Sequence, residues 1–125
     1  MPEAMRVAVV TPYYQEATET LQRCVDSVRA QTHAALVHYC VADGFPRHDL
    51  LDGAPRLRHI VLPNAHANYG ATPRGIGAQC ALADGMDVVC FLDADNLFEP
   101  DHVASLVETY ARARARGTPA DAVFA

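Results

Sequence analysis

The sequence predicts an α/β fold, a three-layer α/β/α sandwich built on a mainly parallel sheet. Short apolar runs rich in β-branched residues alternate along the chain with segments of helical periodicity. The runs are apolar throughout, as expected of strands that are buried on both faces. Because crossovers between parallel strands are right-handed, we expect the strand order 3-2-1-4. A length of 125 residues suits one domain, spanning residues 1–125.

The apolar runs are the predicted strands, and turn residues bound most of them. The expected strands cover 6–11, 36–42, 57–62 and 86–92, and a fifth starts at 122–124. Pro12 closes the first run, Asp43-Gly44 the second and Pro63-Asn64 the third. Residues 45–56 contain prolines and glycines without a clear period, so we expect them to be irregular.

Three helices are expected between and after these strands, over 16–30, from about 72 to 83, and from about 100 to Gly117. Thr72 is the predicted N-cap of the second helix, with Pro73 at its first helical position. Apolar positions predict the buried faces of the last two helices. These positions are Ile76, Cys80 and Ala83 in the second helix, and Val103, Leu106, Val107 and Tyr110 in the third.

Composition argues against several classes of protein. The formal net charge is −5, which disfavours nucleic acid as a partner. The longest apolar run, Val88 to Leu92, is too short to span a bilayer, and no signal peptide is evident. The four cysteines lie in apolar runs without a C-x-x-C pair, so we expect buried free thiols and a reducing compartment. These features predict a cytoplasmic location; the parent enzyme could be peripheral to the inner face of the membrane.

The strongest chemical signal is the pair Asp93 and Asp95, which directly follows the most apolar strand. In the order 3-2-1-4 a crevice opens between the ends of strands 1 and 4, where ligands of open α/β sheets bind. The first strand brings residues 11–14 to the same place. Two carboxylates suit Mg²⁺ or Mn²⁺, held together with substrate phosphates. The alternative is that both aspartates are capping or turn residues at an exposed strand end.

Five segments in this order resemble the N-terminal half of family 2 glycosyltransferases, which have the GT-A fold. They are VAVVTPYYQE (7–16), CVDSVRAQTH (24–33), VADGFP (41–46), NYGATPRGIGAQCAL (68–82) and FLDADNLFEPDHV (91–103). They cover nearly the whole chain, and the ordered set is more specific than any one segment.

The resemblance implies a site for a donor nucleotide and a divalent metal, Mn²⁺ or Mg²⁺. Asp95 matches the principal metal ligand, supported by Asp93. The residues implied to bind the nucleotide are Thr11, Pro12, Tyr14, Asp43, Arg74 and Asp93. Tyr14 would stack on the base, with Tyr13 as the substitute if the register shifts by one.

Each of these residues also has a structural alternative. Tyr14 could pack its ring at a strand end, Asp43 could serve the turn before Gly44, and Arg74 could be a solvated surface residue. Asn68 and Gly70 match the loop before the second helix, where both could serve turn geometry alone. The family usually has a second acid before Asp43, where this chain has Ala42.

The resemblance further implies a parent enzyme of polysaccharide biosynthesis that transfers a sugar to an acceptor hydroxyl with inversion. A UDP-sugar is the expected donor, by frequency in the family. No residue here matches the catalytic base, so we expect a truncated chain that lacks the acceptor half. Its exposed sheet edge could pair with another copy to form a homo-oligomer.

Two other classes of protein are compatible with parts of the sequence. A non-catalytic nucleotide-binding domain fits the short length. A haloacid-dehalogenase-type phosphatase also uses a D-x-D motif, but this chain contains no lysine for its later motif. Gly70, Gly75 and Gly77 lack the spacing of a dinucleotide-binding loop. The six histidines are scattered and are interpreted as structural or surface residues.

Overall fold

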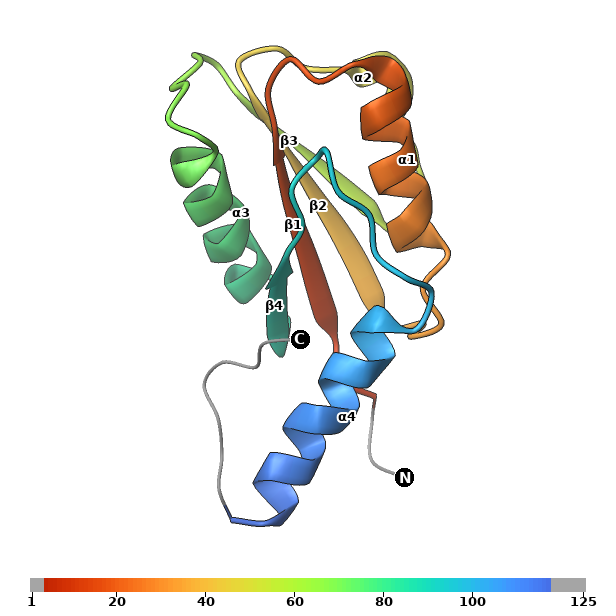
Figure 1. Ribbon diagram of the computed structural model, residues 1–125. Helices are drawn as coiled ribbons and strands as arrows, with labels where there is room; N and C mark the ends of the chain where they lie inside the picture. Colours follow the sequence, from red (N-terminus) through yellow and green to blue (C-terminus); the bar gives the residue numbers. More distant parts are fainter. Residues whose placement is uncertain (1–3, 118–125) are drawn as a thin grey trace.

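A computed structural model describes residues 4–117 and contains one four-stranded parallel sheet with the order β3-β2-β1-β4 (Figure 1). The predicted fold class and strand order are therefore confirmed. The strands are β1 (Val7–Tyr13), β2 (Leu36–Asp43), β3 (Leu57–Leu62) and β4 (Val88–Phe91). The helices are α1 (Thr18–Arg29), α2 (His48–Leu51), α3 (Ala71–Ala83) and α4 (His102–Ala115). The strand expected at 122–124 lies outside the described residues.

The central strand β1 is longer than predicted, because Pro12 does not end it. β1 continues to Tyr13, and Pro12 lies opposite Val41 of β2. The neighbour on the other side, β4, pairs with β1 only from Val7 to Val10. Beyond that point one edge of β1 is open, so the missing N–H of proline removes no bond from a ladder. The open edge also leaves the end of β1 without a neighbouring strand on that side.

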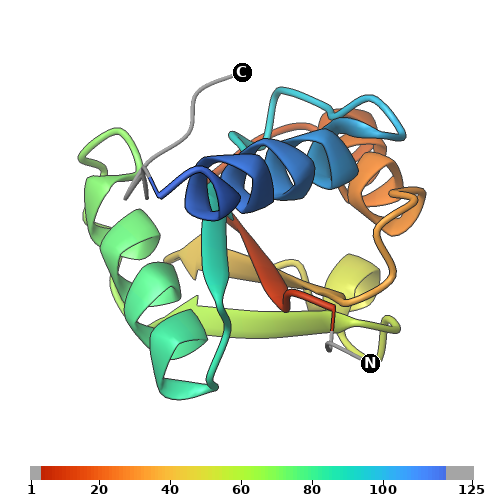
Figure 2. The same cartoon turned by 90° about the horizontal axis from the view of Figure 1, so that it is seen from below.

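Helices cover both faces of the sheet, with α3 on one face and α1 and α4 on the other (Figure 2). Val7 and Val9 pack with residues of α1 and α4, whereas Ala8 and Val10 pack with residues of α3. The two central strands, β1 and β2, are thus buried on both faces, as their composition predicted, whereas the edge strands β3 and β4 are only partly buried. No described helix combines the length and apolar character that crossing a membrane requires.

The helix starts differ from the predictions in two places. α1 begins at Thr18 rather than at 16, and Glu16 instead accepts a hydrogen bond from the backbone N–H of Tyr14 at 2.7 Å. α3 begins at Ala71, after Gly70 in the left-handed conformation, so Thr72 is not the N-cap. The side chain of Asn68 bonds both the hydroxyl and the backbone N–H of Thr72, at 2.6 and 3.3 Å. Asn68 therefore accepts the backbone N–H of Thr72 itself, and the carbonyl of Gly70 accepts the N–H of Arg74 at 2.9 Å.

The buried faces of α3 and α4 are only partly as predicted. α3 buries Pro73, Gly77 and Ala81, while Ile76 and Cys80 flank this face and Ala83 is exposed. In α4 Val103 is buried and the half-buried Val107 packs against the same cluster, while the C-terminal end of the helix extends past the sheet (Figure 1). The short helix α2 lies in the stretch expected to be irregular. All four cysteines are free, with Cys24 and Cys40 buried and Cys80 and Cys90 half-buried.

Candidate functional site: an acidic cleft at the strand ends

A cleft of about 610 Å³ opens where β1, β2 and β4 end, beside the start of α3. Its size falls within the range of small-molecule sites. It lies where ligands of open α/β sheets bind, next to the strands whose connections leave in opposite directions. The lining residues are Pro12, Tyr13, Tyr14, Glu16, Asp43, Ala67, Tyr69, Gly70, Pro73, Asp93, Ala94 and Asp95.

The turn after β4 presents two carboxylates to this cleft. Ala94 is 4% exposed and packs in the core with Tyr13, while Asp93 and Asp95 on either side are exposed and line the cleft. The backbone N–H of Asn96 donates to the carbonyl of Asp93 at 3.0 Å, which closes the turn. Burying the small residue between them is what directs both acids outward.

The two acids differ in their partners. Asp93 accepts a hydrogen bond from Arg74 Nη2 at 2.7 Å, and the pair forms an ion pair across the cleft margin. Asp95 makes no side-chain hydrogen bond or ion pair with any residue between 4 and 117. One carboxylate is therefore partly neutralised, and the other is available for a ligand.

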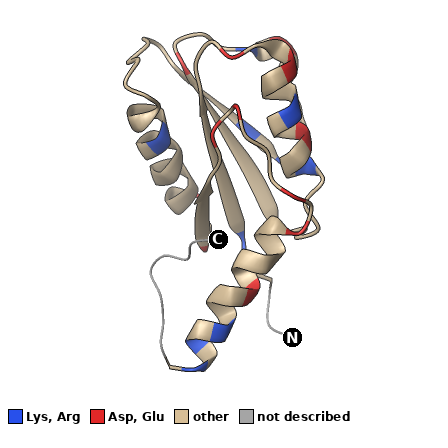
Figure 3. Ribbon diagram, viewed as in Figure 1, with Lys and Arg blue, Asp and Glu red and all other residues tan. Residues whose placement is uncertain are grey.

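The cleft is strongly acidic. Glu16, Asp43, Asp93 and Asp95 line it, and none of the lining residues is an arginine, lysine or histidine. Figure 3 shows acidic residues on the turn after β4, and a single basic position on α3, which is Arg74. Arg74 is not itself a lining residue, and its guanidinium lies 5.9 Å from the ring centre of Phe91.

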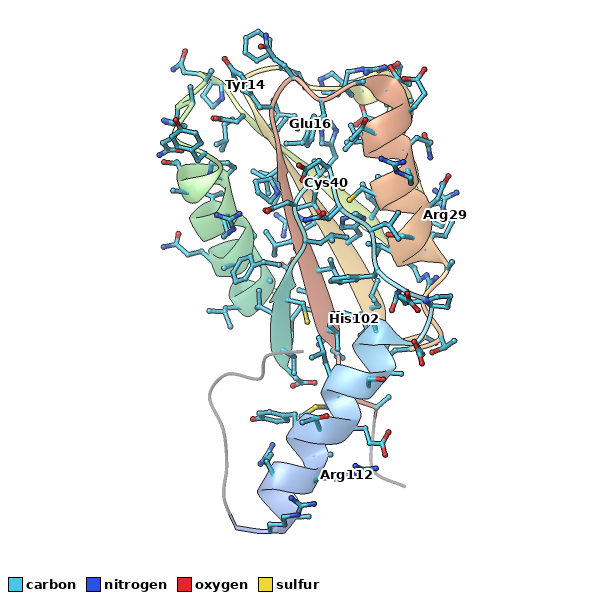
Figure 4. The ribbon with its side chains drawn as sticks, viewed as in Figure 1. Tyr14, Glu16, Arg29, Cys40, His102 and Arg112 are labelled. Carbon is cyan, nitrogen blue, oxygen red and sulfur yellow. The ribbon has the colours of Figure 1, made fainter. Side chains whose placement is uncertain are left out.

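Tyr14 and Glu16 lie together beyond the end of β1 (Figure 4). The half-buried ring of Tyr14 meets the ring of Phe45 edge-on, with centroids 5.1 Å apart. Tyr13, the alternative to Tyr14 for stacking on the base, is only 3% exposed. Burial raises the pKa of Tyr13 to about 12, and its hydroxyl bonds His59 Nε2 at 2.6 Å. Of the two rings, Tyr14 is the one a ligand can reach.

Asp43 ends β2 and holds the loop that forms one wall of the cleft. Its two carboxylate oxygens accept the backbone N–H groups of His66 and Ala67 at 2.8 and 2.9 Å, and the residue is 3% exposed. Gly44 is needed beside it: its φ is +90°, and a Cβ there would lie 2.7 Å from the backbone nitrogen of Ala65. The turn role that the sequence allowed for Asp43 is therefore present, and the residue also lines the cleft.

Thr11 does not reach the cleft. Its side chain is fully buried on the α1 side of the sheet, and its hydroxyl bonds His38 Nε2 at 2.7 Å. Alternation along β1 explains this, because residues 7, 9 and 11 share one face. Of the residues predicted to bind nucleotide or metal, the structure brings Pro12, Tyr14, Asp43, Asp93 and Asp95 into one cleft, with Arg74 at its margin.

The structure also places three residues in the cleft that the sequence analysis did not select: Glu16, Tyr69 and Pro73. Tyr69 is fully exposed and has a φ of +59°, between Ala67 and Gly70, which also have positive φ. No periodic signal marks a loop of this kind. A second missed group is His48, Asp52 and His59, whose ligand atoms lie close together. The i,i+4 spacing of His48 and Asp52 was the available signal.

A parallel sheet of this order, with a cleft at its carboxyl ends, defines a ligand-binding α/β domain. The sequence profile of Glycosyl transferase family 2 matches residues 8–118. The chain therefore belongs to glycosyl transferase family 2. This assignment takes the place of the phosphatase alternative.

Curated relatives agree with the assignment. The chain is 34% identical to the succinoglycan biosynthesis protein ExoW of Rhizobium meliloti, over 86% of this chain and 34% of that protein. It is 35% identical to a glucosyl-dolichyl phosphate glucuronosyltransferase of Haloferax volcanii, over 85% of this chain and 34% of that one. It is 31% identical to an N-acetylglucosaminyltransferase of Mesorhizobium japonicum, over 80% and 24%.

The crystal structure of S. aureus TarS shares the fold, with a TM-score of 0.66 at 16% identity, over 86% of this chain and 20% of that one. The GT-A architecture expected from the sequence is confirmed by this likeness. The chain spans about a quarter to a third of the length of these three relatives.

Proposed function

We propose that this chain is the donor-binding part of a glycosyltransferase, and that its cleft binds a nucleoside-diphospho-sugar, a UDP-sugar by preference, together with Mn²⁺ or Mg²⁺. The observation that carries the proposal is the charge of the cleft, which four carboxylates line without a basic residue. The parent enzyme would transfer the sugar to an acceptor hydroxyl with inversion. The base for that step is not assigned to any residue of this chain.

A diphosphate entering this cleft meets like charges on several sides. Each pair of unit charges about 4 Å apart repels by roughly 1 kcal/mol in water, and by roughly 4 kcal/mol at the effective dielectric near a protein surface. Arg74 is the nearby cation, and Asp93 already engages it. A divalent cation held by the cleft acids would convert this repulsion into attraction.

The residues present suit such an ion. Asp93 and Asp95 offer hard oxygen ligands, and Asp95 is exposed without a described partner. No other carboxylate of the described part completes a three-residue cage with them. Mg²⁺ is commonly held in this way, by one or two carboxylates plus substrate phosphates and water. When bound, the cation would supply charge stabilisation for the departing diphosphate.

The remaining cleft residues would orient the nucleoside. Tyr14 offers a reachable ring for the base, and stacking of this kind contributes about 1–3 kcal/mol per base. Each carboxylate oxygen of Asp43 accepts one backbone N–H, so lone pairs remain that could accept a hydrogen bond from the base. Arg74 lies in the first turn of α3, facing the cleft margin, where an anionic phosphate would be its second partner.

The test is calorimetric titration of the chain with UDP, GDP and dTDP, each in the presence of Mn²⁺ or EDTA. We expect metal-dependent binding, with UDP preferred, and a loss of at least about tenfold in affinity for Asp95→Ala, equal to about 1.4 kcal/mol. Asp101→Ala is the matched control, an exposed aspartate outside the cleft with no side-chain cap bond. Nucleotide binding that persists in EDTA, or that Asp95→Ala leaves unchanged, would refute the metal role.

A further inference from the structure

His48, Asp52 and His59 form a compact group of the residue types that bind metals, at a place separate from Asp93 and Asp95. Asp52 lies between the two histidines in the chain: Nδ1 of His48 on α2 is 2.8 Å from its Oδ2, and Nδ1 of His59 on β3 is 2.8 Å from its Oδ1. The ligand atoms of all three residues lie within 4.8 Å of one another. The group therefore offers two imidazole nitrogens and a carboxylate around one point.

The surroundings of the group resemble a supported site rather than a chance surface contact. The His59 side chain is only 6% exposed, and its second nitrogen, Nε2, lies 2.6 Å from the hydroxyl of Tyr13. The Tyr13 oxygen in turn accepts the backbone N–H of Arg47 at 3.0 Å. A ligating histidine usually has such a partner on its other nitrogen, which fixes the ring and its tautomer. His48 and Asp52 are more than half exposed, so an ion can reach the group from solvent.

The proton arrangement also allows a metal to enter while each histidine keeps a partner for its proton, although the O–H of Tyr13 then no longer has Nε2 of His59 as its acceptor. In the metal-free state each Nδ1–H can donate to Asp52. If the proton moves to Nε2, each Nδ1 presents a lone pair. For His59 the new Nε2–H can donate to the Tyr13 oxygen, and for the exposed His48 it can donate to water.

We propose that His48, Asp52 and His59 form a transition-metal site of the zinc class, separate from the acidic cleft. Two imidazoles and one carboxylate match the three protein ligands of an open zinc site, with water in the fourth position. Imidazole nitrogen selects Zn²⁺ over the hard cations that suit Asp93 and Asp95. Tetrahedral bonds of 2.0–2.1 Å imply ligand separations of about 3.3 Å. The 2.8 Å contacts must therefore open by a few tenths of an ångström, which the exposed His48 can allow.

Occupancy of this site would stabilise one wall of the cleft. An ion there would tie α2 to the start of β3, and His59 would hold the hydroxyl of Tyr13, a residue that lines the cleft. The proposal does not depend on the nucleotide-sugar donor, because it concerns a different set of ligands and a different class of metal.

The test is titration of the full chain, without a polyhistidine tag, with Zn²⁺ by calorimetry and with Co²⁺ by visible absorption. We expect one equivalent of Zn²⁺ to bind, a tetrahedral Co²⁺ spectrum, and no displacement by a large excess of Mg²⁺. His48→Gln and Asp52→Asn, both at exposed positions, should abolish the cobalt spectrum. Tyr13→Phe, which removes only the supporting hydroxyl, should weaken Zn²⁺ binding by about 10–100-fold.

Two controls separate this site from the others. His66→Gln removes an exposed histidine outside the group, and Asp95→Ala removes the free acid of the cleft, so both should bind Zn²⁺ as the unaltered chain does. The proposal is overturned if the folded chain takes up no Zn²⁺, if His48→Gln and Asp52→Asn bind it normally, or if Asp95→Ala is the variant that loses it.

Discussion

The close approach of α3 to the sheet depends on Gly77, and replacing this residue with alanine should destabilise the protein. A Cβ at this position would lie 2.5 Å from Val10 Cγ1 and 3.1 Å from Val41 Cγ2. Real Cβ atoms essentially never come within 3.0 Å of another heavy atom. Val10 and Val41 are fully buried and β-branched, so they have little freedom to move aside.

Two opposing effects decide the magnitude. Alanine is favoured over glycine inside a helix by about 1 kcal/mol. An extra carbon in a close-packed core costs about 1–3 kcal/mol, and the 2.5 Å contact places Gly77→Ala at the upper end of that range. We therefore expect the free energy of unfolding to fall by about 1–2 kcal/mol net.

Gly75→Ala is the matched control, because it makes the same change in the same helix with nothing within 4 Å of the new Cβ. It should raise the free energy of unfolding by about 0.5–1 kcal/mol through helix propensity alone. Urea unfolding followed by circular dichroism measures both variants, with equal m-values as the check that the unfolded state is unchanged. Gly77→Ala as stable as Gly75→Ala would show that α3 does not pack on the sheet as described.

The remaining predictions concern two buried polar groups. Asp43→Asn should lower the free energy of unfolding by about 1–3 kcal/mol, because one backbone N–H of the 66–67 loop loses its acceptor, whereas Asp101→Asn should not. Urea unfolding at pH 7 measures both, and equal midpoints would contradict the role of Asp43. Burial lowers the pKa of His38 to about 3, so the unfolded chain takes up a proton first as the pH falls below 6.5. The free energy of unfolding should then decline by up to about 1.4 kcal/mol per pH unit. His38→Gln should flatten this decline between pH 7 and pH 5. An unchanged slope would show that His38 is not the group responsible.

The strand pattern could be predicted from the sequence because each strand is a short apolar run, and in β1 and β2 that run is buried on both faces. β3 has the predicted limits, and β2 differs by the one residue Asp43. The end of β1 could not be predicted from the local sequence, because a proline such as Pro12 usually ends a strand. Here β4 stops pairing at Val10, and that tertiary fact makes the proline tolerable.

Helix starts were predicted less well, because residues outside the helix decide them. The left-handed Gly70 and the side chain of Asn68 set the start of α3, and neither belongs to the apolar period that marks the helix. α2 has only four residues, too few for any periodic signal. Buried faces shift for a related reason: α3 packs through Pro73, Gly77 and Ala81, small or compact residues that a search for large apolar side chains passes over.

The candidate site was predictable where it depends on strand ends and not where it depends on loops. Asp43, Asp93 and Asp95 lie at or just after the carboxyl ends of parallel strands, which meet at one edge of the sheet, and all three line the cleft. Thr11 is also at a strand end, but its position in the alternation points it toward α1. Glu16 and Tyr69 reach the cleft because of the conformations of their loops. The positive φ of Tyr69 could not be predicted, because a tyrosine rarely adopts it.

The pairing of Asp93 with Arg74 gives the two cleft acids different parts in the proposed function. Arg74 partly neutralises Asp93 before any ligand arrives, so within this pair Asp95 carries the uncompensated charge. A diphosphate that binds with the cation would compete for the same guanidinium, because Arg74 lies in the first turn of α3, where its donors and the helix dipole both favour an anion. Releasing Asp93 from Arg74 would then make it a second metal ligand at the moment the phosphates are present. If the proposed function is right, metal and nucleotide should bind more tightly together than either does alone, since each would remove the charge that opposes the other.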